Sequence, residues 1–109
     1  MAHDEGLAQR IRERLDGRPD VVEKRMFGGV CFLLRGNMSC GVYKDKLIVR
    51  VGPEAHEAAL SREHVSPFDI TGRPMKGWIM VEPPGSAEDD TLERWISQGL
   101  GFAGTLPAK

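Results

Sequence analysis

The first residues of the chain place apolar side chains at the spacing of a helix, with polar and charged residues between them. The apolar positions recur every four residues, at Leu7, Ile11 and Leu15. This pattern predicts an amphipathic helix over Asp4–Asp16, which Asp4 can cap at its start. Gly17 fits the C-terminal cap, because glycine readily adopts the positive φ angle that ends many helices.

Four short apolar runs follow, and turn-forming residues separate them. The runs are VVEKRMF (21–27), VCFLL (30–34), MSCGVY (38–43) and KLIVRV (46–51). Such short connections favour hairpins, so the sheet is predicted to be antiparallel. In the fourth run Leu47, Val49 and Val51 alternate with Ile48 and Arg50. That alternation predicts one packed face and one face partly exposed to water.

The segment GPEAHEAALSR (52–62) predicts a short second helix, with Pro53 in its first turn, where the missing N–H costs nothing. Two further strands are expected in SPFDIT (66–71) and WIMVEP (78–83), joined by a turn in GRPMKG (72–77).

The last periodic segment is SAEDDTLERWISQGL (86–100), and it predicts a closing helix. Ser86 and Asp89 have the spacing of a capping box at its start. Trp95 lies on its apolar face. The remaining GFAGTLPAK is too rich in glycine and proline to extend the helix.

Together these elements predict an α+β fold. An antiparallel sheet of about five to six strands is flanked by N-terminal and C-terminal helices, in the order α-β-β-β-β-α-β-β-α. A length of 109 residues fits one domain over 1–109, with a flexible tail from about residue 101.

Net charge and segment hydropathy limit the classes of partner. A formal net charge of -1 and a pI of about 6.3 give no overall basic field of the kind that draws nucleic acid or membranes. The N-terminus lacks the apolar core of a secretory signal, and no segment approaches the roughly 18 apolar residues of a membrane span. We therefore expect a cytoplasmic protein that does not contact membranes.

Two cysteines lie in neighbouring predicted strands. A three-residue hairpin loop over Arg35–Asn37 would place Cys40 opposite Phe32, so that Cys31 and Cys40 point to opposite sides of the sheet; a two-residue loop would make the cysteines diagonal neighbours. In the absence of an export signal we interpret both as reduced, small apolar fillers.

The sequence offers little support for catalysis. His56 and His64 have no ligand at zinc spacing and are interpreted as exposed, and there is no GxSxG nucleophile motif. Gly28 and Gly29 precede a strand, not a helix, so a turn or bulge is favoured over a phosphate cradle. We expect no catalytic residue, no cofactor and no metal site.

Four basic residues near the N-terminus are candidates for nucleic-acid binding: Arg10, Arg14, Lys24 and Arg25. Acidic residues are interleaved with them, so a solvated face of ion pairs is the favoured interpretation. Binding to phosphates needs a patch whose positive charge is not compensated.

The order of these segments resembles the TfoX N-terminal domain family, related to the bacterial competence regulator TfoX/Sxy. The resemblance extends from about Leu7 to Leu100 and includes a Tyr43–Leu47 hairpin. Its most specific marks are Met26, Phe27, Gly28, Gly29, Gly72, Arg73, Pro74 and Met75. It implies an α+β fold similar to secretion chaperones, with no catalytic residues and no cofactor.

The resulting functional hypothesis is a small non-enzymatic binding or adaptor domain of a bacterium, linked to transcription or competence regulation through protein contacts. Its protein partner is unidentified, and a homodimer is one option. Arg73, Lys76 and Trp78, in a glycine-bracketed turn, are the predicted interaction rim. The alternative is a nucleic-acid-binding accessory domain that uses the basic face of the first helix.

Overall fold

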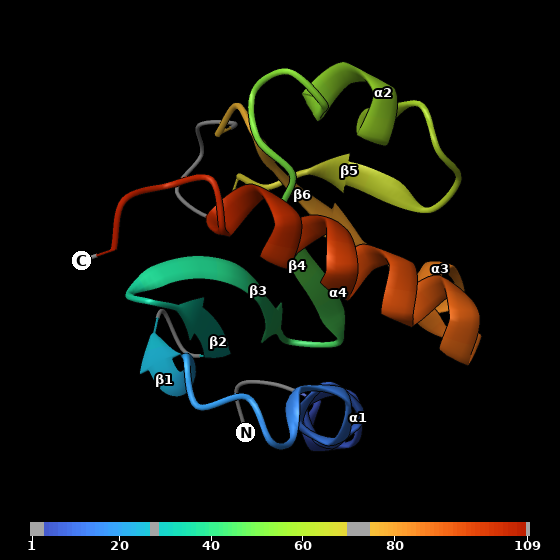
Figure 1. Cartoon of the computed structure of the whole chain (residues 1–109). Helices are drawn as coiled ribbons and strands as arrows, with labels where there is room; N and C mark the ends of the chain where they lie inside the picture. Colours follow the sequence, from blue (N-terminus) through green and yellow to red (C-terminus); the bar gives the residue numbers. More distant parts are fainter. Residues whose placement is uncertain (1–3, 27–28, 70–74, 109) are drawn as a thin grey trace.

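The computed structural model describes residues 4–26, 29–69 and 75–108, and shows one antiparallel sheet with helices packed against it (Figure 1). The sheet has six strands in the order β1-β2-β3-β4-β6-β5. In chain order the elements are α1 (Glu5–Leu15), β1 (Val21–Met26), β2 (Gly29–Leu34), β3 (Asn37–Tyr43), β4 (Lys46–Arg50), α2 (His56–Leu60), β5 (Val65–Pro67), β6 (Trp78–Val81), α3 (Pro83–Ser86) and α4 (Asp89–Ala103). The predicted fold class and element order are confirmed, with α3 as a short addition.

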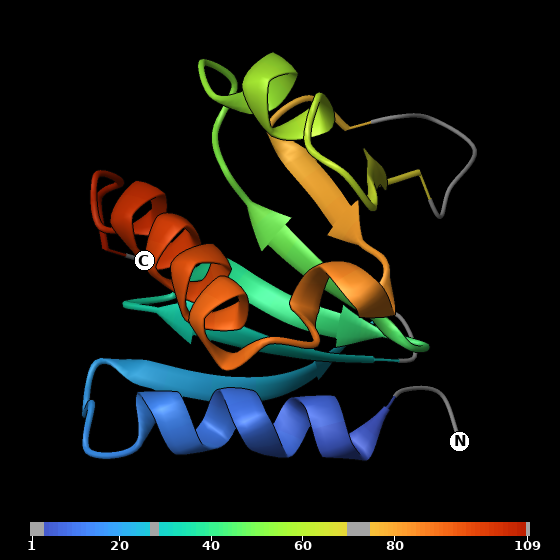
Figure 2. The ribbon, with the colours of Figure 1, turned by 90° about the vertical axis from the view of Figure 1, so that its right-hand side faces the viewer.

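The main core lies between one face of the sheet and the helices. Figure 2 shows α1 and α4 lying across this face. Their buried apolar residues are Leu7, Ala8, Ile11 and Leu15 from α1, and Leu92, Trp95 and Ile96 from α4. The strands contribute alternate residues to the same cluster, including Leu47 and Val49 of β4. Apolar residues that repeat with a period of 3.6 in the helices and of 2 in the strands therefore pack together in this core.

Helix α1 begins and ends as its sequence predicts. The Asp4 carboxylate accepts a hydrogen bond from the Leu7 N–H over 3.1 Å, which satisfies one of the free amides of the first turn. Gly17 has a φ of 85°, a left-handed conformation that other residues rarely adopt.

The segment between β4 and β6 differs from its prediction. Helix α2 begins at His56, so Pro53 lies before the helix and not in its first turn. His56 is buried, not exposed as predicted, because its ring accepts a hydrogen bond from the Gly77 N–H across the fold. Strand β5 covers Val65–Pro67 and ends before Phe68, earlier than predicted. The end of the predicted strand and the first half of the predicted turn lie outside the described residues.

Helix α4 begins later and ends later than predicted. Ser86 belongs to α3, and the N-cap of α4 is Glu88, with no hydrogen bond from its side chain, so the predicted capping box is not formed. The helix continues through Gly101 to Ala103, because Ala103 is buried in the core and packing outweighs the poor helix propensity of the glycines. Within the described residues, no helix combines the length and apolar character needed to cross a membrane.

The β2–β3 hairpin combines a two-residue turn with a β-bulge. Leu34 pairs with Asn37, so the loop is shorter than the three-residue alternative. The register then shifts between Leu33 and Phe32, and Phe32 pairs with Cys40. The extra residue is Ser39, whose hydroxyl donates to the Phe32 carbonyl over 2.9 Å. Cys40 therefore faces the helices and Cys31 the opposite side, and both are free thiols.

The β1–β2 hairpin carries part of the predicted glycine motif. Met26 pairs with Gly29, while Phe27 and Gly28 lie outside the described residues. A Cβ atom on Gly29 would collide with the Val42 carbonyl oxygen of β3. Gly29 is thus required for the close approach of two backbones, in agreement with a structural role for the motif.

Candidate interaction face

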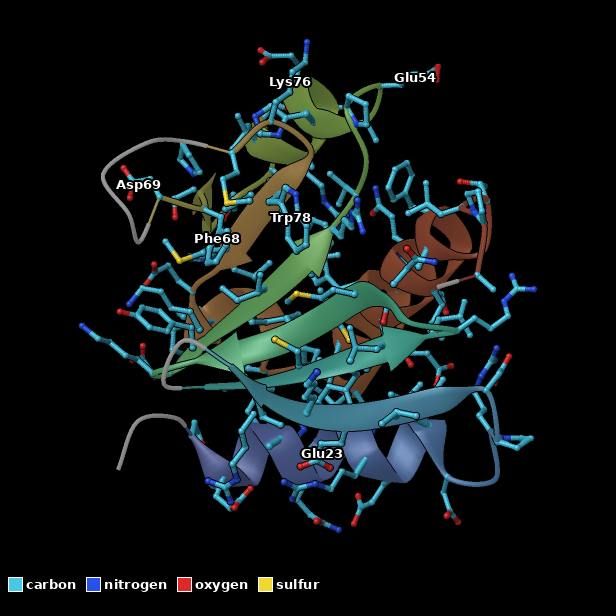
Figure 3. The ribbon with its side chains drawn as sticks, turned by 90° about the vertical axis from the view of Figure 1, so that its left-hand side faces the viewer. Glu23, Glu54, Phe68, Asp69, Lys76 and Trp78 are labelled. Atoms are coloured by element: carbon cyan, nitrogen blue, oxygen red, sulfur yellow. The ribbon has the colours of Figure 1, made fainter. Side chains whose placement is uncertain are left out.

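The face of the sheet that points away from the helices carries a second apolar cluster, called the open face here (Figure 3). Four of its residues are buried, namely Cys31, Met38, Ile48 and Phe68. Four more are partly buried against them, namely Leu33, Tyr43, Trp78 and Met80. Within residues 4–26, 29–69 and 75–108 no helix contributes to this cluster. Among the described residues, one face of the sheet is therefore covered by helices, and the other by strand side chains and Phe68.

Exposed apolar side chains extend the area around the open face. Val22, on the edge strand β1, is 58% exposed and pairs with Leu33. Met75 is 38% exposed, and its backbone is hydrogen-bonded to Phe68 and to Trp78, both over 3.1 Å. Solvent-exposed apolar surface that continues from a buried cluster is typical of an interaction site.

At one end of the open face an arginine is held between two aromatic rings. The central guanidinium carbon of Arg50 lies 4.8 Å from the ring centre of Trp78 and 5.4 Å from that of Phe102. Arg50 and Trp78 are cross-strand neighbours in the β4–β6 pair, whereas Phe102 comes from the last turn of α4. Phe68 adds a third ring, 6.1 Å from Trp78. Both cation–π contacts fix the position of the cation.

The backbone beside Arg50 is held by glycines and by a histidine. Gly52 has a φ of 90°, and a Cβ atom there would lie 2.5 Å from the Phe102 ring, so glycine is needed for this ring to pack against the chain. The Gly77 carbonyl accepts hydrogen bonds from the N–H groups of Val51 and Gly52 over 2.8 and 3.0 Å. The Gly77 N–H donates to His56 Nδ1 over 2.9 Å. This network sets the position of β4 relative to β6 at the point where Arg50 stands.

The open face carries basic side chains together with the acidic Asp69, which lies beside Phe68 (Figure 3). Lys24 shares this face because it pairs with Cys31. Lys46 has acidic neighbours, with Nζ 3.2 Å from Asp45 and 3.9 Å from a Glu82 oxygen. Among the described residues, neither Lys24 nor Arg50 forms an ion pair with an acidic side chain. The open face thus combines an apolar centre with two basic groups whose charge is not compensated.

The predicted interaction rim coincides with the open face only in part. Trp78 belongs to its cluster and is partly buried, and Lys76 is exposed two residues before it. Arg73 lies outside the described residues. Sequence reasoning missed Arg50, although its position two residues after Ile48 placed both on the same face of the strand. The contribution of Phe102 had no local signal, because the contact joins residues that are far apart in the chain.

The structure does not gather the four candidate nucleic-acid residues into one patch. Arg10 and Arg14 on α1 both reach the Asp89 carboxylate, at 3.0 and 3.2 Å. The hydrogen bond from Arg10, followed by the charge of Arg14, lowers the pKa of Asp89. Lys24 and Arg25 are consecutive residues of β1, so their side chains point to opposite faces of the sheet.

Of the titratable residues that sequence analysis considered for catalysis, the two cysteines lie on adjacent strands and on opposite faces of the sheet. Burial raises the pKa of Cys31 to about 11 and that of Cys40 to about 12, so both are thiols at neutral pH. Within the part of the chain that the structure describes, no three His, Cys, Asp or Glu residues come together as a metal site.

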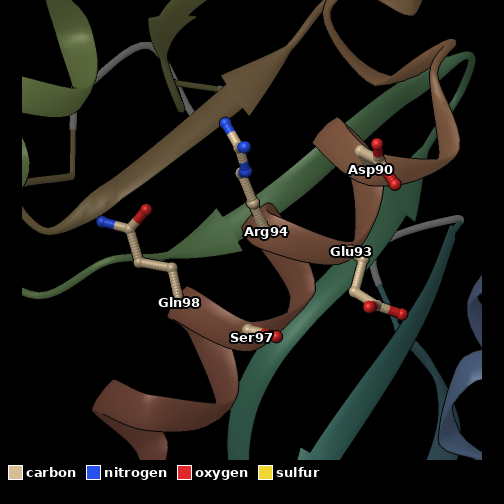
Figure 4. A pocket seen from close by; sticks show the side chains of 5 residues that line it. All are labelled: Asp90, Glu93, Arg94, Ser97 and Gln98. Atoms are coloured by element: carbon tan, nitrogen blue, oxygen red, sulfur yellow. The ribbon is translucent and has the colours of Figure 1, made fainter.

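A surface hollow lies along the exposed side of α4 (Figure 4). Its volume is about 610 Å³. It is lined by Asp90, Glu93, Arg94, Ser97 and Gln98. These side chains have mixed charge and lie on one exposed helix, so the hollow is much less suited to binding an apolar partner than the open face.

Comparison with known proteins gives one match. The TfoX N-terminal domain family matches residues 13–103, which includes every strand of the sheet and all of α4. No curated protein and no solved structure matches the chain.

Proposed function

We propose that this chain, which belongs to the TfoX N-terminal domain family, is a non-enzymatic binding domain that acts through protein contacts on its open face. The observation that carries the proposal is the asymmetry of the sheet. Four helices contribute to the core on one side or lie beside it, whereas the second apolar cluster contains no residue from a described helix.

The physical basis is the hydrophobic effect. Val22 and the partly buried side chains of the open face would lose water contact when a partner covers them, and burial of apolar area is the main driving force of protein association. Two methionines, Met38 and Met80, lie within the cluster, and their flexible side chains can adapt to a partner surface.

Under this proposal a link to transcription or competence regulation would operate through another protein. The alternative, direct contact of the first helix with nucleic acid, has weaker support. Arg10 and Arg14 share an acidic neighbour, Asp89, so part of their charge is already compensated. A phosphate backbone would have to compete with that carboxylate.

Site-specific photocrosslinking in the native cells tests the proposal. A benzoylphenylalanine replaces Tyr43 or Val22 on the open face, and in matched control variants it replaces Glu13 or Ala58, which are exposed on α1 and α2. We expect adducts with a defined protein from the first two positions and none from the controls. The adducts should persist after nuclease treatment and be identifiable by mass spectrometry.

Two results would contradict the proposal. Adducts that form only at Glu13 would place the partner on the helical side. Adducts that nuclease digests would be crosslinks to nucleic acid, and their predominance would contradict binding through protein contacts.

A further inference from the structure

We infer that Arg50 binds a carboxylate of the partner, so that the open face recognises a protein segment that combines apolar residues with an Asp or Glu side chain. The inference rests on the proposed function, because it specifies the partner of the same face. It follows from the way Arg50 is held, from its lack of an acidic neighbour and from the apolar surface beside it.

The two rings hold the guanidinium group of Arg50 without using its hydrogen-bonding capacity. Trp78 and Phe102 lie 4.8 and 5.4 Å from its central carbon. Contacts of this kind involve the ring faces, whereas the five N–H donors of a guanidinium point outward in its plane. Within the described residues the side chain of Arg50 makes no hydrogen bond and no ion pair. Its donors are therefore available to a ligand.

A carboxylate suits these donors better than other groups. The planar fork of arginine matches the two oxygens of a carboxylate and forms paired charge-assisted hydrogen bonds. Arg50 is partly buried and its side chain is held by Trp78 and Phe102, so little conformational entropy is left to lose on binding.

The charges of the open face favour an acidic protein segment over other occupants. Among the described residues, Lys24 on β1 and Arg50 on β4 form no ion pair with an acidic side chain, and the buried Cys31 of β2 and Met38 of β3 lie in the apolar cluster between these strands. A nucleic acid would present phosphates along its whole length, including over this apolar centre, whose described residues are uncharged. A segment with apolar residues in the middle and carboxylates at its ends matches both features.

A second arginine supplies the matched control. The guanidinium carbon of Arg62 lies 4.3 Å from the ring centre of Trp95. Trp95 belongs to the core on the helical side of the sheet and is 2% exposed. Replacing Arg62 by Leu therefore removes an arginine–tryptophan contact of the same kind without changing the open face.

The experiment is a selection from a library of random 12-residue peptides displayed on phage, with the whole chain as the bait. The baits are the unchanged protein, Arg50→Leu, Arg50→Lys and Arg62→Leu, each first shown to unfold cooperatively. Leucine at position 50 keeps apolar contact with Trp78 and Phe102, so the variant should fold. One selected acidic peptide and its amide analogue, with Glu→Gln or Asp→Asn, are then compared by fluorescence anisotropy.

We expect the unchanged protein and Arg62→Leu to enrich peptides that contain apolar residues together with Asp or Glu. Arg50→Leu should still enrich apolar residues but lose the acidic preference, and Arg50→Lys should retain only part of it. The amide analogue should bind the unchanged protein about tenfold more weakly, because a charge-assisted pair is lost, and should bind Arg50→Leu as well as the acid does.

The outcomes separate this inference from the proposed function. Enrichment of apolar peptides without acidic residues would overturn the role of Arg50 and leave the open face as the binding site. No enrichment on the unchanged protein would overturn both. Two further measurements test other occupants. If the protein binds a fluorescent single-stranded oligonucleotide and Arg50→Leu abolishes this binding, the ligand of Arg50 is a phosphate. If light scattering shows a dimer that Arg50→Leu dissociates, the occupant is a second copy of the chain. Either result would overturn the inference.

Discussion

Helix α4 lies so close to the sheet that a single methyl group should distinguish two of its glycines. Gly99 faces β3, and a Cβ atom there would collide with the carbonyl oxygen of Ser39 and lie 3.0 Å from the carbonyl carbon. Gly101 is two residues further along the same helix, and a Cβ atom there would meet no heavy atom within 4 Å. The pair Gly99→Ala and Gly101→Ala therefore adds the same methyl group in two different environments.

The expected free energies have opposite signs. At Gly99 the obstacle is the backbone of a central strand, which cannot rotate away, so we place the overpacking cost at the upper end of its usual range, about 3 kcal/mol. The better helix propensity of alanine returns about 1 kcal/mol, which leaves a net destabilisation of about 2 kcal/mol. At Gly101 only the propensity acts, and we expect a stabilisation of up to about 1 kcal/mol.

Urea unfolding followed by circular dichroism measures both changes. The free energy of unfolding should fall in Gly99→Ala and rise in Gly101→Ala, with unchanged dependence on urea concentration. If Gly99→Ala is as stable as Gly101→Ala, α4 does not pack on Ser39 as described, and the reasoning from the close approach is refuted.

Two further predictions follow from the charged and titratable groups. Burial raises the pKa of Cys31 to about 11 and that of Cys40 to about 12, so both thiols should react with a disulfide reagent at pH 8 only after unfolding. The free energy of unfolding should decline as pH rises above about 8.5, because the thiols of the unfolded chain ionise there. Equally fast reaction of the folded and the unfolded protein would contradict this prediction. Arg10, and after it Arg14, lower the pKa of Asp89, so the ion pairs of Asp89 should stabilise the fold at pH values above the pKa of the unfolded carboxyl. This stabilisation should be lost as pH falls through the lowered pKa of the folded protein. In thermal unfolding scans Asp89→Asn should remove this dependence on acidic pH, and an unchanged pH profile would contradict the prediction.

Local patterns predicted the elements well where packing and propensity agree. The Leu7 spacing and the Asp4 cap were sufficient for α1, and turn residues separated the strands of the meander correctly. The end of α4 was mispredicted because propensity alone favours a stop at Gly101, whereas the buried Ala103 and the contact of Phe102 with Gly52 favour continuation.

The candidate site was only partly predictable for the same reason. Trp78 could be singled out because an aromatic residue beside a turn is unusual among polar neighbours. Arg50 becomes distinctive only when Phe102, half the chain away, lies against it. The burial of His56 likewise depends on its long-range hydrogen bond to Gly77. Contacts of this range leave no periodic signal in the sequence.

The bulge at Ser39 also decides whether the two cysteines can react with each other. If the pairing set by the Leu34–Asn37 turn continued without the extra residue, Cys31 would stand directly opposite Cys40, and not diagonal to it as predicted for a two-residue loop. Residues so paired have Cα atoms about 4.5 to 5.5 Å apart, which a disulfide can span. An oxidising environment during folding would thus trap the shifted register covalently, with Val42 turned away from the helices. The single extra residue protects the chain from an oxidative misfolding route as well as aligning its core.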